Sequence, residues 1–212
     1  MRGEIFMSDK EEILMSQTQV ESDQSSRIVW QHFFGLAIIL SFVPTMFEFE
    51  YSLAFEYLTH KTLHILGGIM FTGNMLVSAV WMFFARKTKD KNVILFTSKT
   101  SEMLDRYVAA PGIVLILFNG ILMASLFGGA WETQWLSEVV ARFVIVTGIW
   151  ILYLVPKQKA ITKGVQAAVD NNTDLPETFL SDSKRWIIWS SVVVFFLFWT
   201  VQIMITKPTG EF

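Results

Sequence analysis

Long apolar segments constrain the fold of this chain more than any other feature. Five of them are present, at residues 28–47, 57–84, 107–127, 135–155 and 186–205. Each is long enough to cross a bilayer, which takes roughly 20 residues. Backbone groups in lipid need hydrogen-bond partners within the protein, and these segments lack the alternation of barrel strands. The sequence therefore predicts an all-α, polytopic membrane helix bundle of five transmembrane helices, a four-helix core plus one extra.

The composition agrees with a membrane protein and excludes several functions. Hydrophobic residues make up 52% of the chain and charged residues only 17%, which is too little for the surface of a soluble domain of this size. A net charge of −2 gives no reason to expect nucleic acid as a partner. The chain has no cysteine, so disulfides, thiolate metal sites and cysteine nucleophiles are excluded. The lipid bilayer is the expected partner.

Charge placement predicts the orientation. Two connections between the segments are basic, at residues 85–106 and 156–185, whereas residues 48–56 and 128–134 contain no Lys or Arg. The positive-inside rule assigns the two basic loops to the cytoplasm of a bacterial inner membrane, with the N-terminus inside and the C-terminus outside. The predicted domains are a cytoplasmic tail at residues 1–27, a transmembrane domain at residues 28–206 and a C-terminal tail at residues 207–212.

Two histidines and an acid at the start of the second segment suggest a metal site. Glu56, His60 and His64 are spaced by four, so they share one helix face. Two histidines at this spacing can chelate one metal ion, and a carboxylate one turn away can be a third ligand. The alternative is that Glu56 and His60 are solvated residues at the level of the lipid headgroups.

A second candidate site uses polar residues inside the predicted spans. His64, Asn119 and Arg142 all fall in the outer half of the membrane under this orientation, and Gln202 lies near the outer end of the fifth segment. The neutral imidazole of His64 can ligate haem iron or simply hydrogen-bond to a neighbouring helix, and Arg142 can bind a haem or porphyrin carboxylate. The alternative for Arg142 is an ion pair with Glu138 on its own helix.

Other residues are expected to support the helices. Small residues recur every four positions on the second and third segments, as suits helix packing: Gly68 and Thr72, and Gly120, Ala124 and Gly128. Asp105 is expected to cap the N-terminus of the third span, and the alternative is a contact with the basic loops or with a ligand. Pro111 is expected to mark a helix end or kink. Four aromatic residues are expected to lie as anchors at the membrane interfaces: Tyr107, Trp131, Trp135 and Trp186.

Several stretches between residues 55 and 160 resemble a bacterial family of predicted integral membrane proteins of unknown function. They are LHILGGIMFTGNM, LDRYVAAPGIVLILFNGILMA and LYLVPKQ, with His64 followed by Gly73, and Asp105 followed by Pro111. That family is distantly similar to the copper-resistance protein D group and to haem-binding membrane protoporphyrinogen oxidases. In those oxidases a histidine on the corresponding helix is implicated in haem binding, and the resemblance places His64 at that position.

The biochemical role is therefore left with three hypotheses. The first is a haem- or porphyrin-binding redox protein that holds haem b through His64, with Arg142 and Asn119 in the same pocket. The second is copper or other metal handling or transport through Glu56, His60 and His64. The third is a non-catalytic membrane subunit whose cytoplasmic basic loops bind a protein partner. The sequence also leaves a homo-oligomer open.

Overall fold

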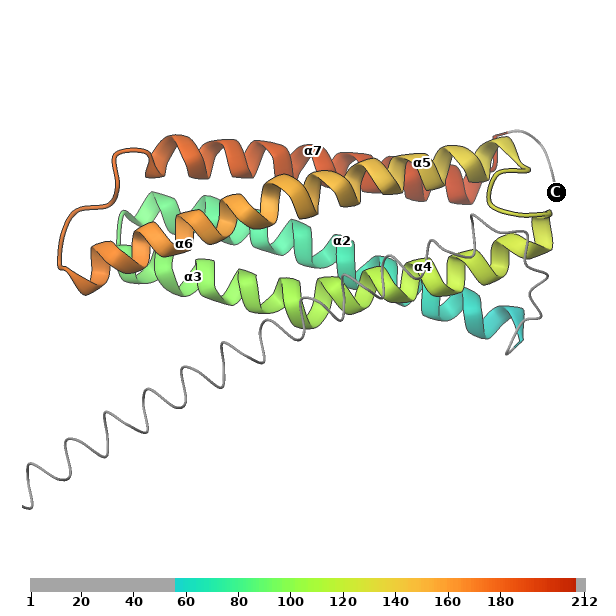
Figure 1. Cartoon of the computed structure of the whole chain (residues 1–212), viewed down its shortest axis with the longest axis horizontal. Helices are drawn as coiled ribbons and strands as arrows, with labels where there is room; N and C mark the ends of the chain where they lie inside the picture. Colours follow the sequence, from blue (N-terminus) through green and yellow to red (C-terminus); the bar gives the residue numbers. More distant parts are fainter. Residues whose placement is uncertain (1–55, 209–212) are drawn as a thin grey trace, which may run out of the picture.

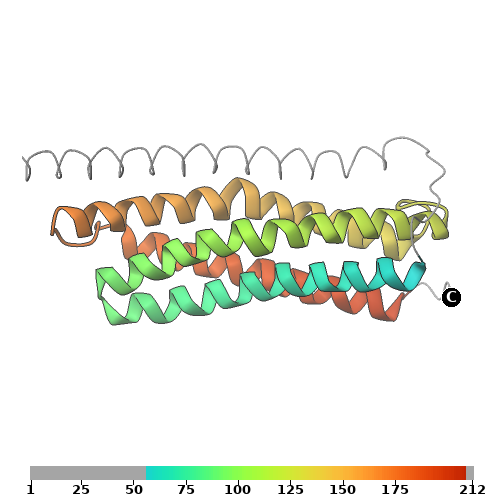
Figure 2. The ribbon, with the colours of Figure 1, turned by 90° about the horizontal axis from the view of Figure 1, so that it is seen from below.

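A computed structural model describes residues 56–208, and this part of the chain is helical without strands. It contains four helical rods long and apolar enough to cross a membrane. The rods lie along one common axis, with the α2–α3 turn and the α6–α7 connection at one end and the α4–α5 connection at the other (Figures 1 and 2). The all-α bundle is confirmed for these residues. The predicted extra span at residues 28–47 and the N-terminal tail lie outside them.

Two of the rods are single helices and two are composite. The single ones are α2 (Tyr57–Thr88) and α7 (Phe179–Thr206). The second rod consists of α3 (Lys91–Leu104), a π-helical turn (Asp105–Ala109), α4 (Ala110–Ala124) and a 3₁₀ turn (Ser125–Phe127). The third consists of α5 (Gln134–Ile149), a second π-helical turn (Trp150–Leu154) and α6 (Val155–Asp170).

Each π-helical turn comes just before a proline. Pro111 and Pro156 each occupy one of the first two positions of the helix that follows the turn. Proline has no N–H to donate, and its ring clashes with the carbonyl four residues earlier. The wider turn, in which Ala110 N–H donates to the Asp105 carbonyl, lets the helix continue without that clash. Pro111 therefore lies inside a continuous rod and does not end the helix.

The two connections expected to be basic loops are largely helical. The first shrinks to a tight turn in which Lys89 has a φ of 57°. Asp90 then caps α3, because its side chain accepts hydrogen bonds from the backbone N–H groups of Asn92 and Val93. Half of the second connection is α6, which packs against α3. The loops were predicted wrongly because hydropathy detects contact with lipid and not the helix that continues beyond it.

The backbones of α2 and α4 approach each other closely. A Cβ added to Gly67 would lie 2.6 Å from the carbonyl oxygen of Gly112, and one on Gly112 would lie 2.9 Å from that of Gly67. The two backbones can approach this closely only because both residues are glycines. Gly68, which was expected to form the packing face, has nothing within 4 Å of an added Cβ. Deeper in the bundle, Phe71 packs edge-on against Phe143 and Trp150.

Candidate functional site

The α2–α4 interface brings together His60, His64 and Asn119. His60 is fully buried, and its Nδ1 lies 2.8 Å from Asn119 Oδ1. His64 lies one turn further along α2, and its Nδ1 is 2.8 Å from the backbone carbonyl oxygen of Ile116. Both imidazoles therefore face α4. His60 is a buried interior residue and not the solvated headgroup-level residue considered from the sequence.

Hydrogen bonding determines which nitrogen of each ring carries the proton. A carbonyl oxygen only accepts, so His64 Nδ1 must be the donor to Ile116. Asn119 Nδ2 donates to the Leu115 carbonyl at 2.9 Å, which leaves Asn119 Oδ1 to accept from His60 Nδ1. In the neutral form of each histidine, Nε2 then carries the lone pair.

Gly120 provides room for the His64 ring. A Cβ at this position would lie 3.0 Å from Cε1 and 3.1 Å from Nδ1 of His64. The small residue predicted to seat a neighbouring helix thus accommodates an imidazole. Any larger residue at position 120 would push the ring away from α4.

The three predicted metal ligands have different surroundings. Glu56 is exposed and precedes α2, and its backbone carbonyl accepts hydrogen bonds from Thr59 and His60. His60 is buried against Asn119, whereas His64 is partly exposed. Within residues 56–208, no group of three or more His, Asp or Glu side chains is placed to hold a metal ion.

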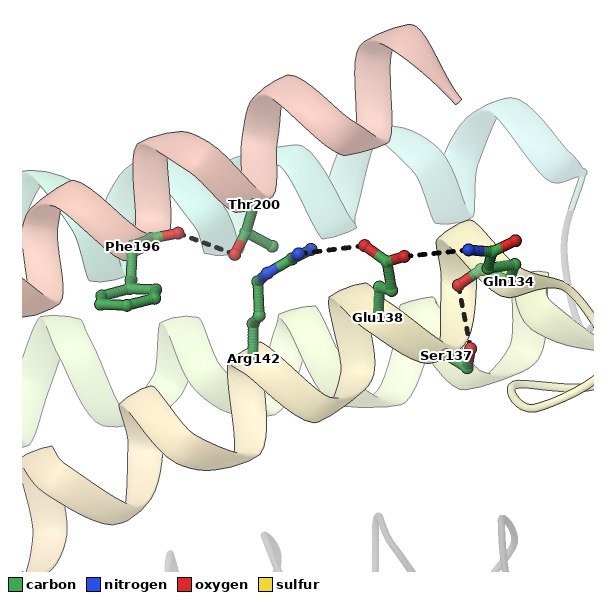
Figure 3. Close-up of polar contacts among 6 residues, drawn as sticks. All are labelled: Gln134, Ser137, Glu138, Arg142, Phe196 and Thr200. Carbon is green, nitrogen blue, oxygen red and sulfur yellow. Dashed lines mark hydrogen bonds and ion pairs between the residues drawn. The ribbon is translucent and has the colours of Figure 1, made fainter. Parts of the chain in front are cut away.

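Arg142 makes its contacts on the other side of the bundle (Figure 3). Its Nη2 lies 3.0 Å from Glu138 Oε2, as expected for an acid and a base four residues apart on one helix. Its guanidinium carbon lies 4.7 Å from the centre of the Trp199 ring on α7, a cation–π contact. Its Nη1 is buried without a hydrogen-bond partner. The predicted pocket of His64, Asn119 and Arg142 is thus divided between the α2–α4 and α5–α7 interfaces.

Gln202 does not join the histidines either. It is exposed on α7 and lines a shallow surface depression together with Phe195, Phe198 and Trp199. This depression lies beside Arg142, because Trp199 contributes to both. Apolar side chains line most of it, as they would on a lipid-facing surface.

A second polar cluster, which the sequence analysis missed, lies where α2, α3 and α6 meet. Asp105 was expected as an acid at a helix N-terminus, but it lies within a rod, and Asn74 Nδ2 donates to its Oδ1 at 2.7 Å. Gln158 of α6 faces the same carboxyl group. Asn74 and Ser78 are spaced by four inside an apolar segment, and this spacing was the available signal.

Comparison with known proteins identifies the family but no relative of established activity. No curated protein and no solved structure matches the chain. A family described as "predicted integral membrane protein (DUF2269)" matches residues 58–208, which include all four rods and both polar clusters. This match covers more than half of the chain. The chain therefore belongs to the DUF2269 family of predicted integral membrane proteins.

Proposed function

We propose that this protein binds haem b, or a related porphyrin, as a redox protein and that His64 is the axial ligand. The observation that carries the proposal is the 2.8 Å hydrogen bond from His64 Nδ1 to the Ile116 carbonyl. Histidines that ligate metals almost always donate their other ring N–H to a carbonyl or carboxylate, which orients the ring and leaves Nε2 as the ligand. A haem held in this way would supply one-electron chemistry.

The surroundings of His64 suit a fixed ligand. His64 is partly exposed, so a ligand can approach it. Gly120 leaves the space that the ring occupies. Asn119 contributes indirectly, since it holds the neighbouring His60. Arg142 is not part of this proposal, because its guanidinium contacts Glu138 and Trp199.

An absorption spectrum tests the proposal. The full-length protein, expressed with ample haem and purified in mild detergent, is expected to show a Soret band. His64→Ala should abolish this band while the protein still elutes as a folded species. His32→Ala, which changes the histidine outside the described residues, is the matched control and should keep the band.

Elemental analysis of the same samples separates haem from copper. Iron in proportion to the Soret absorbance supports haem. Colourless protein that contains copper, and loses it in His60→Ala and His64→Ala, would contradict haem. That result would support the alternative of metal handling through Glu56, His60 and His64. Protein that contains neither metal would contradict both proposals.

We also propose that the bundle lies in a bacterial inner membrane, with residues 28–47 as a fifth span and the α2–α3 turn in the cytoplasm. The positive-inside rule supports this orientation. On the proposed cytoplasmic side, α3 and α6 extend the bundle and expose Lys99, Lys159 and Lys163.

These lysines make the role of a membrane subunit the second candidate, because exposed cations can bind an acidic cytoplasmic protein. Such a partner should co-purify with the wild-type protein and be lost from the variant Lys159→Glu/Lys163→Glu. Recovery of the wild-type protein alone would argue against this role.

A further inference from the structure

The cluster around Asp105 contains more polar groups than it has partners for. Asn74 is 6% exposed and Gln158 is 3% exposed, and both side chains face the Asp105 carboxyl group. Although Asn74 donates to Asp105 through Nδ2, its Oδ1 has no partner. Buried polar atoms are rarely left unpaired in proteins, because each one lowers the stability of the fold.

Two serines extend the cluster by one helical turn. The α2–α3 turn makes these helices antiparallel, so the residue one turn after Asn74 lies level with the residue one turn before Asp105. These residues are Ser78 and Ser101, which are 2% and 0% exposed. Neither hydroxyl has a hydrogen-bond partner. We therefore expect four oxygen-bearing side chains along the contact between α2 and the second rod, two from each.

Oxygen acceptors outnumber donors in this cluster. Besides the Asp105 carboxylate, Asn74 Oδ1 and Glu102 Oε1 are buried acceptors without partners. Among residues 56–208, no Lys or Arg forms an ion pair with Asp105. A largely enclosed carboxylate without a counter-charge is unfavourable, so Asp105 takes up either a cation or a proton.

We propose that this cluster is a sodium site. Hard cations take oxygen ligands, and the cluster offers carboxylate, amide and hydroxyl oxygens from α2, α3 and the first π-helical turn. Asp105 is the charged ligand, and Asn74 Oδ1, Glu102 Oε1 and the two serine hydroxyls are the further oxygens. Asp105 and Glu102 are both partly exposed, and the other three side chains contribute neutral oxygens, so the site carries few negative charges and suits a cation of low charge. Ionisable residues within membrane bundles commonly mark ion sites and pathways.

The local structure around Asp105 also supports a binding site at this position. The π-helical turn that precedes Pro111 carries Asp105, and π-helical turns are frequent at functional sites. The wider turn changes the register of the side chains on the rod, so the acid faces α2 and α6. This inference does not depend on the proposed haem ligand, because His64 contacts α4 and the cluster lies at the α2–α3–α6 contact.

Thermal unfolding of the full-length protein in detergent tests the site. A sodium ion bound only to the folded state should raise Tm, by about 3–6 °C at ten times the half-saturating concentration. The rise should saturate in NaCl and be absent in choline chloride at the same ionic strength. Equal Tm values in the two salts would overturn the proposal and indicate that Asp105 is neutralised by a proton instead.

Variants test whether the sodium-dependent rise in Tm arises at the Asp105 cluster. Asp105→Asn should abolish the sodium-dependent rise in Tm, and Asn74→Ala should raise the half-saturating concentration at least about fivefold. Glu138→Gln removes an acid at the other end of the bundle, and His64→Ala removes the proposed haem ligand, so both should keep the wild-type response. A sodium response that persists in Asp105→Asn would overturn the assignment. So would a response in which Ca²⁺ or Mg²⁺ acts at much lower concentration than Na⁺. If Asp105→Asn does not fold, Asn74→Ala and the wild-type comparison of the two salts still decide the question.

Discussion

At the scale of single residues, the buried pair of His60 and Asn119 joins α2 to α4. Replacing Asn119 by Leu keeps a similar size but leaves His60 Nδ1 without its 2.8 Å acceptor. A buried donor without a partner is costly, so we expect Asn119→Leu to lower the free energy of unfolding by about 1–2 kcal/mol. Titration of the purified protein with SDS, followed by helical circular dichroism, measures this change. Gln202→Leu, at an exposed site, is the control and should stay within about 0.5 kcal/mol of wild type.

The role of Trp186 was predicted wrongly from the sequence. It was expected as an interfacial anchor, but it is 2% exposed and its Nε1 donates to the Leu154 carbonyl at 3.1 Å. Trp186→Phe keeps most of the ring and removes this hydrogen bond, so we expect a loss of about 1 kcal/mol. The same titration checks it. Trp131→Phe serves as the comparison, because Trp131 is 55% exposed, and an equal effect of the two substitutions would show that the hydrogen bond contributes nothing.

At the scale of helices, adjacent glycines on α2 provide a matched pair of variants. Gly67→Ala would place a Cβ 2.6 Å from the Gly112 carbonyl, and backbone cannot move aside as a flexible side chain can. Forcing the helices apart should cost about 1–3 kcal/mol. Gly68→Ala meets open space and should be neutral or stabilising by up to about 1 kcal/mol, because Ala favours the helix. Equal stabilities of the two variants would contradict the close α2–α4 approach.

The difference between Gly67 and Gly68 shows which features could be predicted from the sequence and which could not. Hydropathy predicted the four rods within residues 56–208, because a run of apolar residues is a property of one segment. Which glycine faces a neighbour depends on how two helices meet, which one segment does not reveal. The same holds for His60, whose partner Asn119 is 59 residues away, and for Asp105, whose partner lies on α2. The prediction that His64 and Arg142 share a pocket used membrane depth alone, but they belong to different interfaces.

At the scale of the whole molecule, the orientation of the bundle in the bilayer determines which side of the membrane each site faces. The chain has no cysteine, so single cysteines can be introduced to test this orientation. Lys89→Cys and Lys159→Cys place single thiols on the α2–α3 turn and on α6, both at exposed positions. Trp131→Cys places one in the connection between α4 and α5, at the opposite end of the bundle (Figure 1). If the basic end faces the cytoplasm, a membrane-impermeant maleimide should label only Trp131→Cys in intact cells and all three after permeabilisation. Labelling of Lys159→Cys in intact cells would show that the bundle has the opposite orientation in the membrane. The His64 end would then face the cytoplasm and the Asp105 cluster would lie toward the outside, so any sodium reaching it would come from the external medium.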